Sequence, residues 1–469
     1  MSSGPPAAEA VPLPAIPTPS GLDGNVGTLH LFFTVLAFNA PLAIAVGFIP
    51  VVVSYGNGVG APVAYLAAGL LIFLFAIGFT TMSRYMPNPG GFYAYISAGL
   101  GRITGLGASF LALLCYYFMI IASYAFGGLV LESLVRDTLH GPDVSWWVWV
   151  LVLGVVVSTL GYFKLDLSAR VLTIALIAEL CLVLVYDAAV VFQGGAEGLG
   201  TQSFTPAAAS SGSVGIALLF GLTCFGGFEA TVIFRDEVQS PERTIPRAAY
   251  LVVAAVTGLY VLTTWVFVQA YGPSAVIEAA GADPTGSFLG SVENYVGRVV
   301  VDLVTVLLVT STFAAILAGH NVMSRYVYNL SLDRVLPNVL SKVHGRHGSP
   351  YRASIAVAVL SLTGVALLVL FSADPATLYA VLFGMFGYTL IVLLLLTSIA
   401  IPVYFRRNSI SVSRWKSTVA PALAFIGLCV ATGLATQNLD LLIGGAMIRT
   451  CGSREGVPSR MMIWKVSEF

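Results

Sequence analysis

The 469-residue chain has little charge. Only 9% of its residues are charged and 57% are hydrophobic, whereas about 25% of the residues of an ordinary soluble domain are charged. Such a chain cannot cover a surface that faces water. The formal net charge is zero, so no basic stripe exists to displace counterions from a nucleic acid. These absences exclude a soluble fold and nucleic acid as a partner, and the expected surroundings are a lipid bilayer.

Motifs of metal sites, disulfide frameworks and enzymes are also missing. The 5 cysteines include no C-x-x-C pair, and the 5 histidines fall mostly at the ends of apolar runs or between them. Neither H-E-x-x-H nor G-x-S-x-G occurs, and no Gly-Lys pair exists for a phosphate-binding loop. We therefore expect no metal site, no cofactor, no enzymatic activity and no direct use of ATP.

Long apolar runs are what the chain does have, and they reach the 18 or more residues that cross a bilayer. Backbone groups in hydrocarbon must bond within their own segment, so each run predicts a helix, and the fold class is an all-α polytopic membrane protein. Eleven spans are predicted: Leu29–Ser54, Ala61–Tyr85, Leu106–Val135, Trp146–Leu165, Ser168–Val191, Gly212–Glu237, Ile245–Tyr271, Val299–Leu330, Ser354–Phe371, Leu378–Tyr404 and Thr418–Thr436.

The basic residues predict the orientation of these spans. Sixteen Lys and Arg residues fall on one side, and only Arg136 and Arg298 fall on the other. Since Lys and Arg accumulate in cytoplasmic loops, we expect a multi-pass protein of the cell membrane with a cytoplasmic amino terminus.

The two ends of the chain differ from the apolar transmembrane region between them, residues 29–442. Residues 1–28 contain no Lys or Arg and many prolines, which predicts a disordered cytoplasmic tail. Residues 443–469 are mixed in polarity, with four basic residues that an odd helix count places outside. We interpret this C-terminal tail as a truncated or frame-shifted end in place of a twelfth helix.

Two spans are interrupted near their middle. The first contains Pro41 within Asn39–Ala45, and the sixth contains Gly226 and Gly227 within Thr223–Glu229. Paired interruptions of this kind mark the substrate site of many transporters, because they free backbone N–H groups for a carboxylate and carbonyls for an ammonium group. The alternative is that Pro41 only kinks its helix and the glycines only permit close helix packing.

Three segments carry a resemblance to a known family. The stretch FGLTCFGGFEATVIFRDEVQSPERTIPRA, the stretch PNPGGFYAYISAGLG, and ILAGHNVMSRYVYNLSLDRVLP with the following HGRHGSP are similar to the matching parts of the amino acid–polyamine–organocation (APC) superfamily of permeases. The resemblance covers about residues 29–442. It implies a five-plus-five inverted repeat with broken first and sixth helices, alternating access, and coupling to protons, sodium or counter-substrate.

The resemblance also implies binding residues. The family's carboxylate-binding break falls on Ala43, Ile44 and Ala45, where the family's glycines are absent. The carbonyls that receive the substrate amine fall on Thr223, Cys224 and Gly226, and Thr223 stands where some members have an aromatic gate.

Two carboxylates are candidates for coupling or gating. Glu179 lies inside the fifth span, at a position where many proton-coupled relatives have a lysine. Charge in the membrane interior is costly, so Glu179 is expected to bind the coupling proton, hold a cation or pair with a cationic substrate. A structural hydrogen bond to a neighbouring helix is the alternative. Glu229 borders the sixth-span break, where it either takes part in gating or caps freed N–H groups.

Other polar groups in the spans receive less weight. Thr310, Ser311 and Thr312 carry hydroxyls that fit a sodium ion, although such hydroxyls usually bond the preceding helical turn. Asp187 and Asp302 lie nearer helix ends, where water is expected to solvate them.

The function that follows is secondary active transport, as symport or antiport, of an amino acid or related amine, with the proton as the expected coupling ion. A channel would need a continuous polar pore lining, which the spans do not show. A non-transporting nutrient sensor on the same fold, and an inactive truncated permease, remain as alternatives.

Overall fold

The computed structural model describes residues 26–86, 90–163, 169–235, 238–284, 286–344, 349–370 and 375–437. These residues form helices joined by turns, with one isolated β-bridge between Val26 and Val238. Nine of the helical spans among them are long and apolar enough to cross a membrane, and Trp146–Tyr162 and Val214–Thr223 are shorter apolar helices. This agrees with the eleven predicted spans. Residues 1–25 and the C-terminal tail at 443–469 lie outside the described residues.

The first five spans occupy residues 28–193. Their helices are α1 (Thr28–Phe38), α2 (Pro41–Gly47), α3 (Ile49–Tyr55), η1 (Gly58–Gly60), α4 (Ala61–Ser83), α5 (Gly91–Leu100), α6 (Arg102–Ser133), which continues as the π-helix η2 (Leu134–Thr138), α7 (Trp146–Phe163) and α8 (Ala169–Gln193).

The next five spans, and an eleventh, follow. Their helices are η3 (Gln202–Phe204), α9 (Pro206–Ala209), α10 (Val214–Thr223), α11 (Ala230–Ile233), α12 (Pro241–Tyr271), α13 (Val276–Ala282), α14 (Ser287–Tyr295), α15 (Arg298–Leu332), η5 (Asn338–Ser341), α16 (Tyr351–Leu370), α17 (Pro375–Arg407), η6 (Trp415–Val419) and α18 (Ala420–Thr436).

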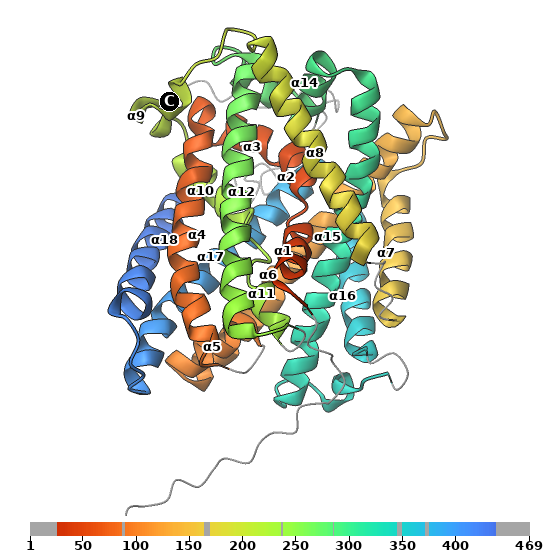
Figure 1. Ribbon diagram of the computed structural model, residues 1–469. Coiled ribbons are helices and arrows are strands. Elements are labelled where there is room, and N and C mark those ends of the chain that lie inside the picture. Colours follow the sequence, from red (N-terminus) through yellow and green to blue (C-terminus); the bar gives the residue numbers. More distant parts are fainter. Residues whose placement is uncertain are drawn as a thin grey trace, which may run out of the picture.

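The two sets of five spans have matching elements in inverted orientation. Each set begins with a broken helix, α1/α2 in the first and α10/α11 in the second. Each has a short helix just before its long third span: α5 precedes α6, and α14 precedes α15. Figure 1 shows α5 at the bottom of the bundle and α14 at the top, as an odd number of intervening spans requires. The fold is therefore the inverted-repeat bundle that the resemblance implied.

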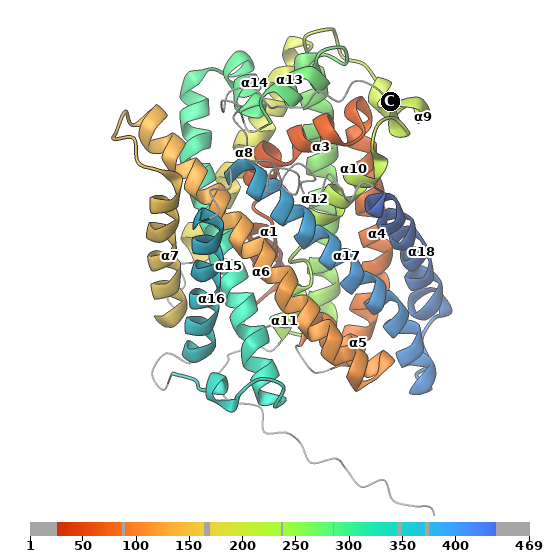
Figure 2. The ribbon, with the colours of Figure 1, turned by 180° about the vertical axis from the view of Figure 1, so that it is seen from behind.

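The broken helices lie at the centre of the bundle, between the longer spans. The α1 helix packs against α8, α12 and α15, and α10 packs against α4, α17 and α18. Figure 2 shows α6 and α17 running diagonally side by side in front of α1, and the two helices are in contact. This arrangement surrounds the interrupted backbone with protein and keeps it from lipid.

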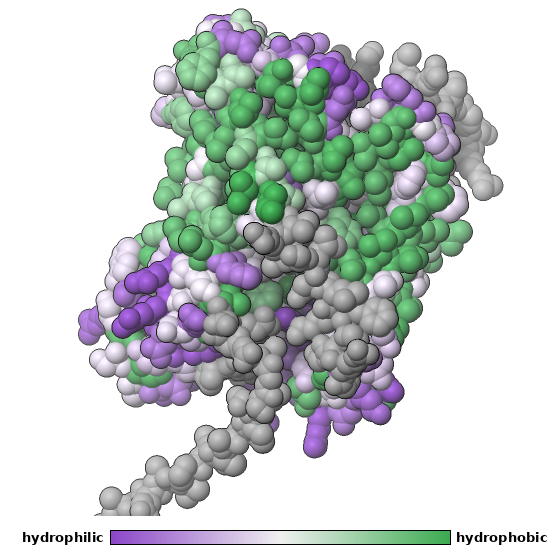
Figure 3. Space-filling model, turned by 45° about the vertical axis from the view of Figure 1, so that its right-hand side comes forward, coloured by the Kyte–Doolittle hydropathy of each residue, from purple (hydrophilic) through white to green (hydrophobic). Residues whose placement is uncertain are grey.

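The outer surface has the polarity of a membrane protein. A broad apolar band separates two polar zones in Figure 3. We call the end with Arg84, Arg102, Arg243 and Arg406 the basic face, and the opposite end, which carries α9, α13 and α14, the acidic face.

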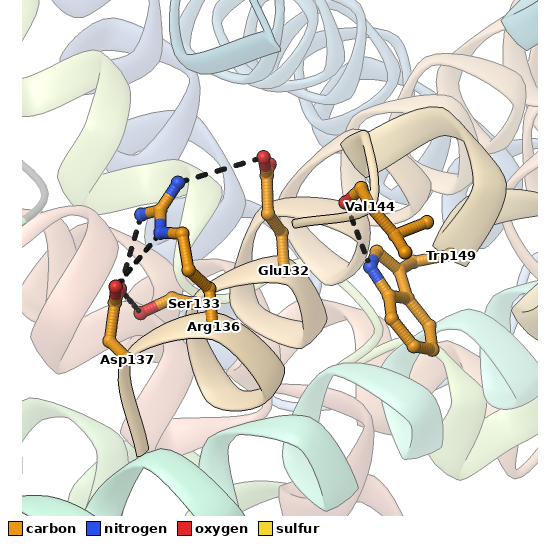
Figure 4. A network of polar contacts seen from close by, with 6 residues as sticks. All are labelled: Glu132, Ser133, Arg136, Asp137, Val144 and Trp149. Carbon is orange, nitrogen blue, oxygen red and sulfur yellow. Dashed lines mark hydrogen bonds and ion pairs between the residues drawn. The ribbon is translucent and has the colours of Figure 1, made fainter. Parts of the chain in front are cut away.

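Among the described residues, the two arginines assigned to the acidic face, Arg136 and Arg298, are both paired with carboxylates. Arg136 binds Asp137 through its Nε, 2.8 Å from Oδ1, and lies 3.8 Å from Glu132 (Figure 4). Arg298 lies 3.4 Å from Asp302 and 3.6 Å from Glu293. These arginines are about half exposed, so each pair adds little stability, but the pairing leaves neither arginine free to neutralise a carboxylate inside the bundle.

Candidate functional site

The first break lies between α1 and α2. Ala40 has a left-handed backbone, with φ 45° and ψ 68°, and Pro41 opens α2 at a position where the missing N–H costs nothing. Because α2 starts anew at Pro41, the N–H groups of its first turn have no partner within the helix. The Ala43 N–H donates to no backbone acceptor among the described residues.

The second break lies between α10 and α11. Turns with hydrogen bonds between residues three positions apart replace the helical pattern. The Phe225 N–H donates to the Leu222 carbonyl, and the Gly226 N–H donates to the Thr223 carbonyl at 2.9 Å. Gly227 has φ 88°, which a side chain would disfavour. In the described part of the chain, the carbonyls of Cys224 and Gly226 accept no backbone hydrogen bond. The predicted interruptions are thus both present, and each leaves backbone groups unpaired.

A central cavity of about 50 Å³ lies between the two breaks. Both breaks line it, together with α6, α15 and α17. Of the predicted binding residues, Ala43, Ile44, Thr223 and Gly226 line the cavity, whereas Ala45 and Cys224 are buried without lining it. The other lining residues are Phe38, Asn39, Ala40, Phe48, Met119, Ser123, Phe126, Thr312, Ala315, Tyr379, Phe383 and Phe386.

Aromatic rings close the central cavity toward the acidic face. Phe48 packs on Phe383 with ring centroids 4.9 Å apart and on Tyr379 at 5.5 Å, and Phe126 stacks on Tyr379 at 4.5 Å. Sequence reasoning noted that Thr223 replaces an aromatic gate on the sixth span, and here α17 supplies aromatic side chains at the same cavity. The path to the acidic face is closed.

A larger cavity lies toward the basic face. It has a volume of about 260 Å³ and is lined by the start of α1, by Phe234 after α11, by Arg325 on α15 and by Ser354 at the start of α16. Phe38 lines both cavities and stands between them. The Arg325 guanidinium lies over the Phe234 ring, 4.6 Å from its centroid. The structure therefore has the acidic side closed and a wide vestibule on the basic side.

Glu179 on α8 is buried, with 3% of its surface exposed, beside the first break. The Ser311 hydroxyl of α15 donates to Glu179 Oε2 at 2.8 Å. The Leu42 N–H in the first turn of α2 is a second donor to the carboxyl. Thr310 and Thr312 instead bond carbonyls of their own helix, Leu307 and Leu308, at 2.8 Å. Glu179 thus ties three elements together, α8, α15 and the broken first helix.

Glu229 is buried at the second break. Tyr116 on α6 donates to its Oε1 atom, while Oε2 has no hydrogen-bond partner. The Glu229 side chain does not cap α11, but the backbone N–H groups of Gly227 and Glu229 at the break are donors to its carboxyl, so both interpretations of this residue stay open. The Tyr116 ring packs at 5.4 Å on Tyr326 and at 6.3 Å on Phe38. Glu229 is therefore joined, through Tyr116, to the ring that separates the two cavities.

One expectation about the remaining ionisable groups is wrong. Asp187 was expected to be solvated, but only 3% of its surface is exposed. Helix α14 covers this end of α8, where Phe288 packs on Tyr186 at 5.0 Å. Asp302, in contrast, is partly exposed and paired with Arg298. His320 is buried with its Nε2 atom 2.8 Å from Ser354 Oγ, and no group of three potential metal ligands occurs within the described ranges.

Sequence reasoning missed the contribution of α6 and α17 to the cavity. Met119, Ser123 and Phe126 on α6, and the three aromatic residues of α17, resemble ordinary packing residues. The available signal was their spacing, because Tyr379, Phe383 and Phe386 recur every three to four residues and so share one face of the helix.

Paired helix breaks around a closed central cavity, in a bundle of apolar helices, define a polytopic all-α membrane transporter. The comparisons with known proteins give the family. The family described as "Amino acid permease" matches residues 30–445, and the chain belongs to it.

Several known transporters are about a quarter identical to the chain over the residues that align. The amino-acid permease RocC of Bacillus subtilis is 24% identical over 363 residues, which cover 74% of this chain and 73% of that protein. The human cystine/glutamate transporter is 24% identical over 315 residues, 66% of this chain and 60% of that protein. The branched-chain amino acid permease BcaP of Bacillus subtilis is 24% identical over 313 residues, 63% and 65% of the respective chains.

Proposed function

We propose that this permease is a secondary active transporter that carries amino acids or related amines across the cell membrane by alternating access. The observation that supports this most strongly is the central cavity between the two helix breaks. It is lined by unpaired backbone groups of both signs and by no charged side chain. A zwitterion is the small solute that satisfies both kinds of group.

The two breaks give the substrate an orientation. We place its carboxylate at the first break, beside the Ala43 N–H and the backbone of Ile44 and Ala45, and its ammonium group at the carbonyls of Cys224 and Gly226 beside Thr223. The substrate side chain then faces the apolar and aromatic residues of α6 and α17. Backbone groups bind the carboxylate and ammonium groups that all amino acids share. Selectivity among amino acids therefore depends on Phe126, Tyr379 and their neighbours.

Glu179 is the proposed coupling residue, with the proton as the coupling ion. As a carboxylate it accepts hydrogen bonds from Ser311 and Leu42, which join α8 to α15 and to α2. Charge-assisted bonds of this kind are stronger than neutral ones. Protonation weakens both bonds at once and releases α2 from its neighbours, so proton binding is linked to movement of the substrate-binding break. Glu229 and Tyr116 are assigned to gating, because they adjoin Phe38.

The basic face is assigned to the cytoplasm, which makes the amino terminus cytoplasmic. The vestibule on that face then opens toward the cell interior, and the aromatic cluster closes the exterior. In this orientation the structure corresponds to a state that is closed outside and widened inside.

Counterflow tests the proposal without any assumption about the driving ion. The full chain is reconstituted in proteoliposomes loaded with one unlabelled amino acid at a time, and entry of the same labelled amino acid is followed. We expect exchange for at least one amino acid or amine. Gly226→Ala should abolish it, since the added methyl group would overlap the Phe386 ring. Gly258→Ala is the control, because its methyl group would meet nothing within 4 Å.

Absence of exchange for every amino acid and amine, with binding still measurable by a shift in thermal stability, would contradict the transporter assignment. That result would favour a sensor on the same fold.

A further inference from the structure

A second carboxylate lies buried on α8 outside the site described above. Asp187 Oδ2 accepts a hydrogen bond from the Thr263 hydroxyl of α12 at 2.9 Å. Its Oδ1 atom is buried and has no hydrogen-bond partner. On the same stretch of α12, the Thr264 hydroxyl and the Tyr260 hydroxyl are also buried without partners. Three unsatisfied polar atoms in the apolar interior of a membrane protein are costly unless something binds to them.

No cation neutralises Asp187 among the described residues. At this end of the neighbouring helices α14 and α15 the charged groups are Glu293, Arg298 and Asp302, which pair with one another at the exposed rim; Arg325, also on α15, lies toward the basic face. The other titratable neighbours are tyrosines: Tyr186 beside it on α8, which is hydrogen-bonded to Ser291 at 2.7 Å, and Tyr260 on α12. An uncompensated carboxylate in such surroundings either acquires a proton or destabilises the fold.

The position of Asp187 relates it to Glu179. The two residues are eight positions apart on one helix, about 12 Å along its axis, and Asp187 is the one nearer the acidic face. Tyr260 lies on α12, about one helical turn below Thr263, and its ring packs on Tyr65 of α4 with centroids 5.8 Å apart. Because Thr263 lies level with Asp187, Tyr260 lies between the levels of Asp187 and Glu179 along the bundle, on a helix that packs against α8.

We propose that Asp187 is a second proton-binding carboxyl, and that it exchanges its proton with Glu179 through the hydroxyls of Thr263 and Tyr260. The proposal rests on the coupling role proposed for Glu179. In each exchange, one proton leaves the Asp187 carboxyl and one proton arrives at Glu179. The Thr263 hydroxyl, which already bonds Asp187, and the Tyr260 hydroxyl, to which water molecules supply the missing partners, each gain one proton and give up another, so both end unchanged. Asp187 is left as a carboxylate that the Thr263 hydroxyl stabilises, until it takes a proton from the external water.

In the conformation that the structure shows, a proton route separate from the substrate path would be needed. The aromatic cluster of Phe48, Tyr379 and Phe383 closes the substrate path to the acidic face. Protons from the exterior then need another way to Glu179, and α8, which carries Glu179, is in contact with α12. A separate route lets Glu179 change its protonation without opening the substrate path.

Infrared spectroscopy of the full chain in lipid tests proton binding at Asp187 directly. The carbonyl stretch of protonated carboxyl groups is compared between the Glu179→Gln variant and the Glu179→Gln/Asp187→Asn double variant. We expect a band in the first that is lost in the second. Asp302→Asn is the matched control, because that carboxylate is partly exposed and ion-paired, and it should leave the band in place. An unchanged band in the double variant overturns the proposal.

Transport separates this proposal from the one on which it rests. A single coupled proton supports about a tenfold accumulation ratio per pH unit. We expect Asp187→Asn and Thr263→Val to lower the ratio of gradient-driven uptake to counterflow by about that factor, and Thr263→Ser, which keeps the hydroxyl, to restore it. An unchanged ratio in both variants overturns the relay. If the wild type itself shows no response to a pH gradient, the coupling role of Glu179 fails, while the infrared result still decides whether Asp187 binds a proton.

Discussion

Replacing Gly227 by alanine tests how closely the second break is fitted to the ring that separates the two cavities. Gly227 has φ 88°, and a methyl group at this position would overlap the Phe38 ring. A side chain in such a backbone region costs about 1–3 kcal/mol, and forcing a methyl group into packed surroundings costs about 1–3 kcal/mol more. The sum is about 2–6 kcal/mol against the state that the structure shows.

The lower end of that range reduces the population of this state by about 30-fold, since each 1.4 kcal/mol is a factor of about ten. We therefore expect Gly227→Ala to reduce counterflow exchange in proteoliposomes at least about tenfold. The melting temperature in detergent should fall as well. Adding Phe38→Leu should recover part of the loss, because it removes the overlapping ring and leaves only the backbone strain.

Gly258→Ala is again the matched control, because it adds a methyl group on a helix where nothing lies within 4 Å. It should leave exchange and melting temperature close to those of the wild type. If Gly227→Ala behaves like this control, the break does not have the backbone geometry described here.

Three further substitutions probe other parts of the molecule. Tyr116→Phe removes the hydrogen bond to Glu229. Because hydrogen bonds to charged groups contribute about 1.5–3 kcal/mol, exchange should slow at least about tenfold. An unchanged exchange rate would show that Glu229 and Tyr116 do not take part in gating. The methyl group added by Gly387→Ala would overlap the Thr223 hydroxyl, so this variant should exchange substrate more slowly and melt at a lower temperature. Adding Thr223→Ala to the same chain should restore the melting temperature. Arg136→Gln breaks only exposed ion pairs, so we expect a loss of unfolding free energy below about 1 kcal/mol and unaltered exchange; a large loss would show that the acidic-face pairs are structural.

Much of the fold could be predicted from the sequence, because an apolar run long enough to cross a bilayer must satisfy its own backbone groups and therefore forms a helix. Each of the eleven predicted spans contains an apolar helix, nine of them long enough to cross a membrane, and Pro41 and the Gly226–Gly227 pair mark the two breaks because they alter the backbone directly. The short helices α5, α13 and α14 were not predicted. They have 10, 7 and 9 residues, too few to produce a long apolar period, and α14 is stabilised by packing of Phe288 against Tyr186.

The candidate site was harder to predict, because lining a cavity and packing a core require the same side chains. Ala45 and Cys224 belong to the predicted set, yet their neighbours Ala43, Ile44 and Thr223 line the cavity and they do not. The position of Asp187 along its helix also led to a wrong prediction of its exposure to water. Distance from the helix end predicted contact with water, but α14 folds over that end, and only the tertiary structure shows the cover.

Accumulation of the transported amino acid under a pH gradient is the most direct test of proton-coupled transport through this site. Proteoliposomes with an alkaline interior are compared with proteoliposomes at equal pH, for the wild type and for Glu179→Gln. We predict that the wild type accumulates the amino acid above its external concentration only with the gradient, and that Glu179→Gln exchanges substrate without accumulating it. Equal gradient-driven accumulation by both proteins would contradict the coupling role of Glu179.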